Sequence, residues 1–164
     1  MLKKLLYSSA LCLFVLATAG VAKADTLTYT LTVDGCSSGC GAGPYGTITL
    51  MDDGSGNVNV TEQLATNYYF VNTGAGDPLE FNLSPAGTIT NVQSSTYFQA
   101  GGADKASTFG DFTDSIQCIP ATKNPKTPSP CGSGGSKSLN NPQSLKFTVD
   151  GVNVYDLSAP PAWK

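Results

Sequence analysis

Few residues in this 164-residue sequence could carry acid–base or nucleophilic chemistry. There is no histidine, which excludes serine–histidine triads, histidine general acid–base catalysis and histidine-ligated metals. Carboxylates remain, and a pair of carboxylates is what a glycosidase needs. The only glutamates are Glu62 and Glu80, so such an enzyme would use these residues or aspartates.

Both glutamates lie in segments with the apolar alternation of strands. Glu62 shares the parity of Val58 and Val60, which would turn it inward, but a strand-end glutamate that reaches solvent is the simpler interpretation. Glu80 alternates with its apolar neighbours and is expected to face outward. We therefore expect no catalytic residues and no enzymatic activity, with a carboxylate-based glycosidase as the less favoured alternative.

Four cysteines follow the N-terminal leader: Cys36, Cys40, Cys118 and Cys131. They permit three disulfide pairings, and the sequence does not choose between them. The pairing Cys36–Cys40 with Cys118–Cys131 is favoured because each pair flanks a turn-rich loop. A zinc site is the alternative, but the spacing is wider than C-x2-C, histidine is absent and the chain is expected to be exported.

The stretch "NTGAGDP", residues 72–78, contains Gly74 and Gly76 and resembles a phosphate-binding loop at first sight. Phosphate-binding glycine loops lead into a helix N-terminus and usually carry a lysine. This stretch leads instead into the strand-like "LEFNL" and has no lysine nearby. We interpret it as a corner between two strands, whose glycines supply positive φ.

Acidic loops offer weak candidates for calcium binding. Asp52, Asp53 and Asn57 in "DDGSGN" carry the oxygen ligands that calcium prefers, but the same residues suit a hairpin turn that needs no ion. Asp104, Asp111 and Asp114 form a second acidic group with the same two interpretations. We favour the turns and expect no metal and no cofactor.

Aromatic residues are the remaining binding candidates. Tyr68, Tyr69 and Phe70 are consecutive, so they cannot all face one core, and an exposed ring can stack on a sugar. Trp163 near the C-terminus is a further possible glycan contact. Packing within the fold is the favoured interpretation, because aromatic residues are also ordinary strand formers.

The elements that must position these residues are β-strands. Apolar residues alternate with period two, as in "TLTYTLTV" (26–33), where four threonines occupy the face opposite the apolar side chains. Turn residues recur every 8–12 positions, which is typical of a β-sandwich. We predict an all-β, antiparallel, jelly-roll-like sandwich of nine or ten short strands. The expected strands lie in "TLTYTLTV", "GTITLM", "VNVTEQL", "YYFVN", "LEFNL", "TITNVQ", "TYFQ", "FTDSIQCI", "LKFTV" and "VNVYDL".

The chain divides into a leader and one expected domain. Residues 1–24 have a positive start, a short apolar core and the site Ala22-Lys23-Ala24, which together predict a cleaved secretory signal and a mature chain from Asp25. The remainder, 25–164, forms a single sandwich domain in which the proline-, glycine- and serine-rich segment 120–142 is a flexible loop. No membrane insertion is expected after the signal is removed.

Charge limits the partners. The mature part retains 6 of the 9 lysines and all 12 acids, which gives a net charge of 6 − 12 = −6. Nucleic acid is excluded as a partner because no basic footprint could neutralise its phosphates. Extracellular polysaccharide or other surface proteins are the expected partners of a secreted, acidic chain.

The leader, the opening "TLTYTLTVDGCSSGCGAGPYGTITL" and the "FVNTGAG…LEFNL" centre resemble exported proteins of the PEP-CTERM class, which exosortase sorts in Gram-negative bacteria. The resemblance implies a secreted protein at the cell surface or in the extracellular matrix. Members of that class end in a Val-Pro-Glu-Pro-like tag, a transmembrane helix and a basic tail, whereas this sequence ends "DLSAPPAWK". We expect a non-catalytic surface or matrix component, with a carbohydrate-binding module as the alternative.

Overall fold

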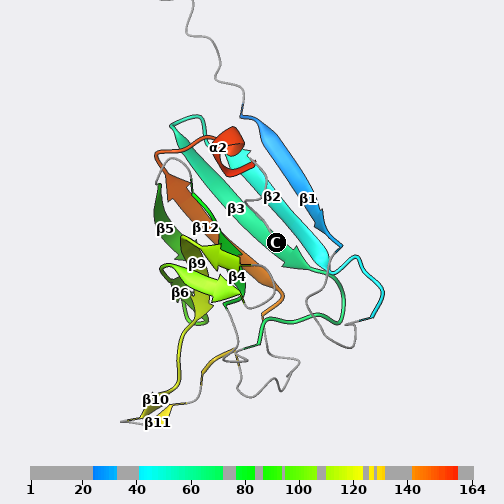
Figure 1. The fold of residues 1–164 in the computed structure, drawn as a ribbon, viewed down its shortest axis with the longest axis vertical. Helices are drawn as coiled ribbons and strands as arrows, with labels where there is room; N and C mark the ends of the chain where they lie inside the picture. The colour runs from blue at the N-terminus through cyan, green and yellow to red at the C-terminus, as the bar shows by residue number, and fades with distance from the viewer. Residues whose placement is uncertain are drawn as a thin grey trace, which may run out of the picture.

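Two antiparallel sheets face each other in a computed structural model of the chain (Figure 1). The structure describes residues 24–32, 41–71, 77–83, 87–93, 95–106, 110–123, 126–127, 129–131 and 142–158. Residues 1–23 of the predicted signal, Cys36, Cys40, the glycines of "NTGAGDP" and Trp163 lie outside these residues. Within the described part, the all-β antiparallel sandwich predicted from the sequence is confirmed.

The larger sheet has five strands in the order β1-β2-β3-β12-β5. They are β1 (Thr26–Leu31), β2 (Gly46–Asp52), β3 (Asn57–Leu64), β12 (Ser144–Asp150) and β5 (Thr88–Gln93). Each adjacent pair runs antiparallel. Consecutive strands β1, β2 and β3 form a meander, whereas β12 comes from the far end of the sequence and inserts between β3 and β5.

The smaller sheet has three strands in the order β4-β9-β6 and lies over the β12 and β5 side of the larger sheet (Figure 1). Its strands are β4 (Leu79–Phe81), β9 (Asp114–Cys118) and β6 (Phe98–Ala100). Two small hairpins accompany it. They are β7 (Asp104–Ala106) with β8 (Gly110–Phe112), and β10 (Thr122–Lys123) with β11 (Lys126–Thr127). The second hairpin lies within segment 120–142, for which the sequence predicted no strand.

The core fills the space between the sheets with the side chains of alternate strand positions. Phe81 of β4 stacks on Phe147 of β12 with ring centroids 5.6 Å apart, which joins the two layers directly. Phe70 packs edge-on against Phe98 at 5.3 Å. Truncating a fully buried aromatic ring of this kind typically costs about 3–5 kcal/mol. The period-two pattern therefore places the apolar residues where the sandwich needs them.

A short helix, α2 (Val154–Ser158), replaces the strand that we predicted for "VNVYDL". Asn153 caps it, because its side-chain oxygen accepts the N–H groups of Tyr155 and Asp156, while the Asp156 carboxylate accepts the N–H of Asn153. This reciprocal cap is a helix-start signal that outweighs the apolar alternation. Val154 and Leu157 are buried on one side of the helix, which lies at the end of the larger sheet (Figure 1).

The expected strand "YYFVN" is also absent, since residues 68–71 are not in a sheet. Asn67 has a φ of 75°, and the N–H of Tyr68 donates to the carbonyl of Ala65, which closes a turn directly after β3. The chain then passes Pro142, whose carbonyl accepts the N–H of Phe70. The left-handed turn at Asn67, which asparagine tolerates better than most residues, ends the strand. No described helix is long and apolar enough to cross a membrane.

Candidate functional site

Glu62 lies in the core, on the inner face of β3. Only 4% of it is exposed, and its register neighbours on that face are Ile48 of β2 and Leu145 of β12. The simpler prediction, a glutamate that reaches solvent, was wrong, and the inward direction given by strand parity holds. Two bulky apolar neighbours and full pairing on both sides of β3 leave this side chain no route to solvent.

The surroundings of Glu62 decide its charge. Burial alone raises the pKa of its carboxyl to about 8, and one carboxylate oxygen, Oε2, is buried without a hydrogen-bond partner. A carboxyl group that is costly to ionise is neutral at pH 7. Burial is the one cause of this raised pKa, and no charge of a neighbouring carboxylate contributes to it.

Glu80 is buried as well, with 6% exposed, so the prediction that it faces outward was wrong. It lies opposite Ser115 in the pairing of β4 with β9, and its carboxylate accepts the N–H of Asp77 at 3.1 Å. Its register partner Ser115 is bound to the segment after β6: the N–H of Gly101 donates to the carbonyl of Ser115, and Ser115 Oγ donates to the carbonyl of Gly102. Glu80 is therefore buried at a position that strand alternation alone would leave exposed.

Three carboxyl groups, Asp77, Glu80 and Asp104, gather at this place. Burial raises the pKa of Asp77, a hydrogen bond with Ser115 lowers it, and the negative charge of Asp104 raises it further. Burial is also the main cause that raises the pKa of Glu80, with smaller contributions from the charges of Asp104 and Asp77. Within the described ranges, no group of three or more cysteines, aspartates and glutamates is arranged to hold a metal ion. Within the cluster, the hydrogen bond from the Asp77 N–H to the Glu80 carboxylate joins these two residues.

The calcium candidates Asp52, Asp53 and Asn57 have local hydrogen bonds in the β2–β3 hairpin. The Asp53 carboxylate accepts the N–H of Ser55 at 2.7 Å, the N–H of Asn57 at 3.2 Å and the side-chain amide of Asn57 at 2.8 Å. The bond from the Asn57 side chain is the largest of the causes that hold the pKa of Asp53 below its ordinary value. The Asp52 carboxylate accepts the N–H of Val154 and thereby supports the start of α2. Each of these acids stabilises a turn or a helix end.

The tyrosine candidates are only partly accessible. Tyr68 is half-buried and packs edge-on against Tyr45, with ring centroids 5.4 Å apart and an interplanar angle of 85°. Tyr69 is also half-buried, and Phe70 is buried in the core. Tyr155 on α2 is the more exposed ring, with 59% accessible, and its hydroxyl donates to the Asp25 carboxylate at 3.2 Å. Sequence reasoning missed Tyr155 because it placed this segment in a strand.

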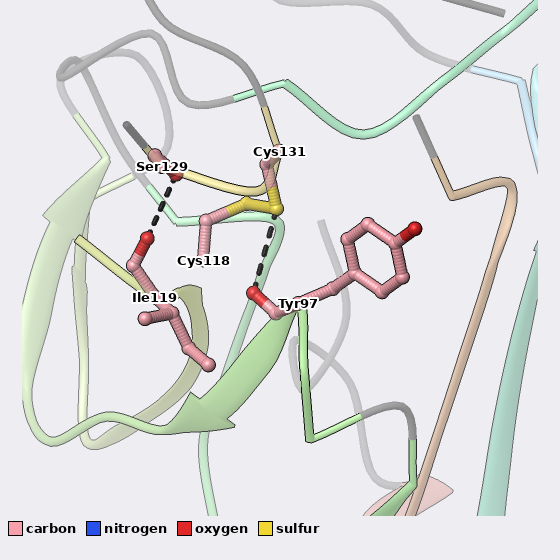
Figure 2. The surroundings of a disulfide bond; sticks show 5 residues. All are labelled: Tyr97, Cys118, Ile119, Ser129 and Cys131. Atoms are coloured by element: carbon pink, nitrogen blue, oxygen red, sulfur yellow. Dashed lines mark hydrogen bonds between the residues drawn. A yellow bond between two sulfur atoms is a disulfide. The ribbon is translucent and has the colours of Figure 1, made fainter. Parts of the chain in front are cut away.

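The disulfide Cys118–Cys131 is present, as the favoured pairing predicts, with the two Cα atoms 6.0 Å apart. Cys131 Sγ lies 3.5 Å from the carbonyl oxygen of Tyr97, and Ser129 Oγ donates to the carbonyl of Ile119 at 2.7 Å. Figure 2 shows both contacts beside the disulfide. Ser129 and Cys131 are both buried. The disulfide therefore fixes residues 129–131 against the end of β9.

The outer face of the five-stranded sheet carries an array of polar, mostly uncharged side chains. Cross-strand registers align Thr28 with Thr49, Thr49 with Thr61, and Thr61 with Lys146. Thr28 and Thr49 share a hydrogen bond with their oxygens 3.4 Å apart. The array comprises Thr26, Thr28, Thr30, Thr47, Thr49, Asn57, Asn59, Thr61, Gln63, Thr88, Thr90, Gln93 and Thr148.

We call this set the threonine face. The alternation of threonine in "TLTYTLTV" indicated its first strand, but the sequence could not show that five strands align it. Met51, Lys146 and Asp150 also lie on this side, and the Asp150 carboxylate accepts the hydroxyl of Thr90 at 2.9 Å. No protein-family model, curated protein or solved structure matches this chain.

Proposed function

We propose that this protein is a non-catalytic, exported component of the cell surface or extracellular matrix, and that its threonine face binds neutral polysaccharide. The observation that carries the proposal is the alignment of hydroxyl and amide side chains over five adjacent strands. The resemblance of the sequence to exosortase-sorted proteins of bacterial surfaces supports the same location.

The chemistry of the threonine face suits a sugar chain. Hydroxyl and amide groups donate and accept hydrogen bonds, and threonine methyl groups add apolar contact with sugar rings. Neighbouring strands lie about 4.8 Å apart, so the face offers binding groups at regular intervals over an extended surface. A largely uncharged array binds a neutral polymer without desolvating many ions, a cost that an acidic polysaccharide would impose.

The burial of both glutamates argues against the enzymatic alternative. Glu62 is enclosed by apolar side chains. Glu80 accepts a hydrogen bond from the backbone N–H of Asp77, which lies just before its strand, β4. Neither residue is accessible to a polysaccharide in this structure. A binding role for the protein needs neither of them.

Pull-down on insoluble cellulose and chitin, with soluble alginate as the acidic comparison, tests the proposal. Thr49→Lys and Thr61→Lys each place a bulky cation at the centre of the threonine face, and Thr66→Lys makes the same change on an exposed turn. We expect the wild-type protein and Thr66→Lys to bind a neutral polymer, and the two central variants to lose at least tenfold in affinity.

Two outcomes would contradict this proposal. Absence of binding to any neutral polysaccharide would remove the role assigned to the threonine face. Loss of binding in Tyr69→Ala, with Thr49→Lys still active, would move the site to the aromatic residues and support the tyrosine alternative.

A further inference from the structure

The two edge strands of the five-stranded sheet, β5 and β1, differ in the regularity of their backbone and in what lies beside their unpaired edge. On β5, Asn91 has a φ of 47°, the pairing with β12 shifts register between Lys146 and Thr148, and β6 of the smaller sheet lies in contact. Strand β1 instead pairs with β2 in unbroken register over all its residues, and no described strand pairs with its other side (Figure 1). Bulges and irregular backbone are devices that prevent strand edges from pairing, and β1 has none of them.

The backbone of β1 presents a regular row of hydrogen-bonding groups on its free side. The carbonyl of Asp25 accepts the N–H of Asp52 at 3.0 Å, which shows that Asp25 faces β2. The N–H and C=O of one residue point to the same side of a strand, and successive residues alternate. Thr26, Thr28 and Thr30 therefore direct their N–H and C=O groups away from β2.

The apolar side of β1 is also incompletely covered. Leu27, Tyr29 and Leu31 pack against the core but are only half-buried, whereas Ile48 and Leu50 of the adjacent strand are buried almost completely. An additional strand beside β1 would cover the exposed parts of these three side chains. The backbone groups of β1 and its half-buried apolar side chains would therefore both be satisfied by an additional strand.

We propose that this neighbour is β1 of a second copy of the chain, paired antiparallel about a two-fold axis at Thr28. Thr28 then lies opposite its own counterpart and Thr26 lies opposite Thr30, and each of these threonines donates one backbone hydrogen bond and accepts one. Leu27 lies opposite Tyr29 in the close, non-hydrogen-bonded positions, so apolar side chains meet on the inner side. The two threonine faces join into one continuous surface.

The distribution of charge permits this partner and favours the antiparallel direction. The strand β1 has no charged side chain, so two copies can approach along it although each chain carries a net negative charge. Asp25 directly precedes the strand. Antiparallel pairing places the two Asp25 carboxylates at opposite ends of the interface, whereas parallel pairing would bring them together.

Sedimentation velocity over a dilution series of the purified full chain tests the proposal. We expect a monomer–dimer equilibrium for the wild-type protein and its loss in Thr28→Lys, which sets two cations opposite each other. Thr49→Lys is the matched control, because Thr49 lies beside Thr28 on the same face but one strand further from the edge. It is expected to remain dimeric.

Single cysteine variants test the register independently of any loss of stability. Hydrogen-bonded pairs in antiparallel sheets have Cα atoms about 5.5 Å apart, which a disulfide can span. Under mild oxidation, Thr28→Cys should form a covalent dimer on a non-reducing gel, and Thr26→Cys should not, because its counterpart faces Thr30.

Several results would overturn the proposal. These are a wild-type protein that stays monomeric at its highest soluble concentration, a dimeric Thr28→Lys, and equal cross-linking of Thr26→Cys and Thr28→Cys. Growth of the wild-type protein into long polymers would also contradict it, since pairing through β1 closes after two copies. If Thr28→Lys proves unfolded, the two cysteine variants decide the question.

Discussion

Replacing Glu62 by glutamine should stabilise the protein at neutral and alkaline pH. Glutamine keeps the size of the side chain and cannot ionise. It therefore removes the free-energy cost of keeping the buried carboxyl protonated at a pH where the unfolded chain would release the proton. The pKa of this group rises from 4.5 to about 8 on folding. Between these two values the folded state holds a proton that the unfolded chain has released, so stability falls as pH rises through this window.

The size of the effect follows from the difference between the folded and unfolded pKa values. A tenfold difference in proton affinity between the two states corresponds to about 1.4 kcal/mol, and a group with these two pKa values reduces the free energy of unfolding by roughly 3 kcal/mol between about pH 5 and about pH 8. Glu62→Gln should remove that dependence. The variant should therefore resemble the wild-type protein near pH 5 and exceed its stability by this amount near pH 8.

Urea unfolding at both pH values measures the difference. Gln63→Glu is the control, because it adds a glutamate at the next position, which is exposed on the threonine face. This control can change stability by a constant but should add no comparable slope with pH. Equal slopes for the wild-type protein and Glu62→Gln would refute the burial of an ionisable group at this position.

Three further changes test the fold. Reducing Cys118–Cys131, which are separated by 13 positions, should lower the free energy of unfolding by roughly 3 kcal/mol in urea, whereas unchanged stability would show that the loop it closes is held by other contacts. Gly46→Ala should cost about 1–3 kcal/mol because its Cβ would lie 2.5 Å from the Gln63 carbonyl oxygen, while Gly102→Ala, with open space around it, should be neutral in the same thermal melts. Asn153→Ala should cost about 1 kcal/mol through loss of the helix cap, and urea unfolding that shows no change would contradict the cap.

The strands themselves were largely predictable, because they depend on a local pattern. "TITNVQ" forms β5 over its whole length, and "GTITLM" and "VNVTEQL" fall within β2 and β3 and their immediate ends. Period-two alternation places a residue on one face whatever its partners are, so the neighbouring strand need not be known. The threonine face required that knowledge, since its rows exist only once registers between distant strands are fixed.

Errors arose where a local hydrogen bond competed with the pattern. "VNVYDL" alternates like a strand, yet the side chains of Asn153 and Asp156 bind each other's backbone and start a helix. "YYFVN" has strong strand formers, but a left-handed Asn67 turns the chain before them. The burial of Glu80 was not predictable from its own segment, because it lies opposite Ser115 of β9, more than thirty positions away, and next to Asp77, whose N–H its carboxylate accepts.

Glu62 shows how the two kinds of sequence evidence can oppose each other at one residue. The residue type predicts that the Glu62 side chain is exposed to solvent, because an ionised carboxylate is costly to bury. Parity argues for the core, and it prevails because turning one side chain outward would shift the register of β3 and expose the valines on the same face. The carboxyl group avoids most of the cost of burying a charge by staying protonated. The remaining cost appears as the part of the pH dependence of stability that Glu62→Gln should remove.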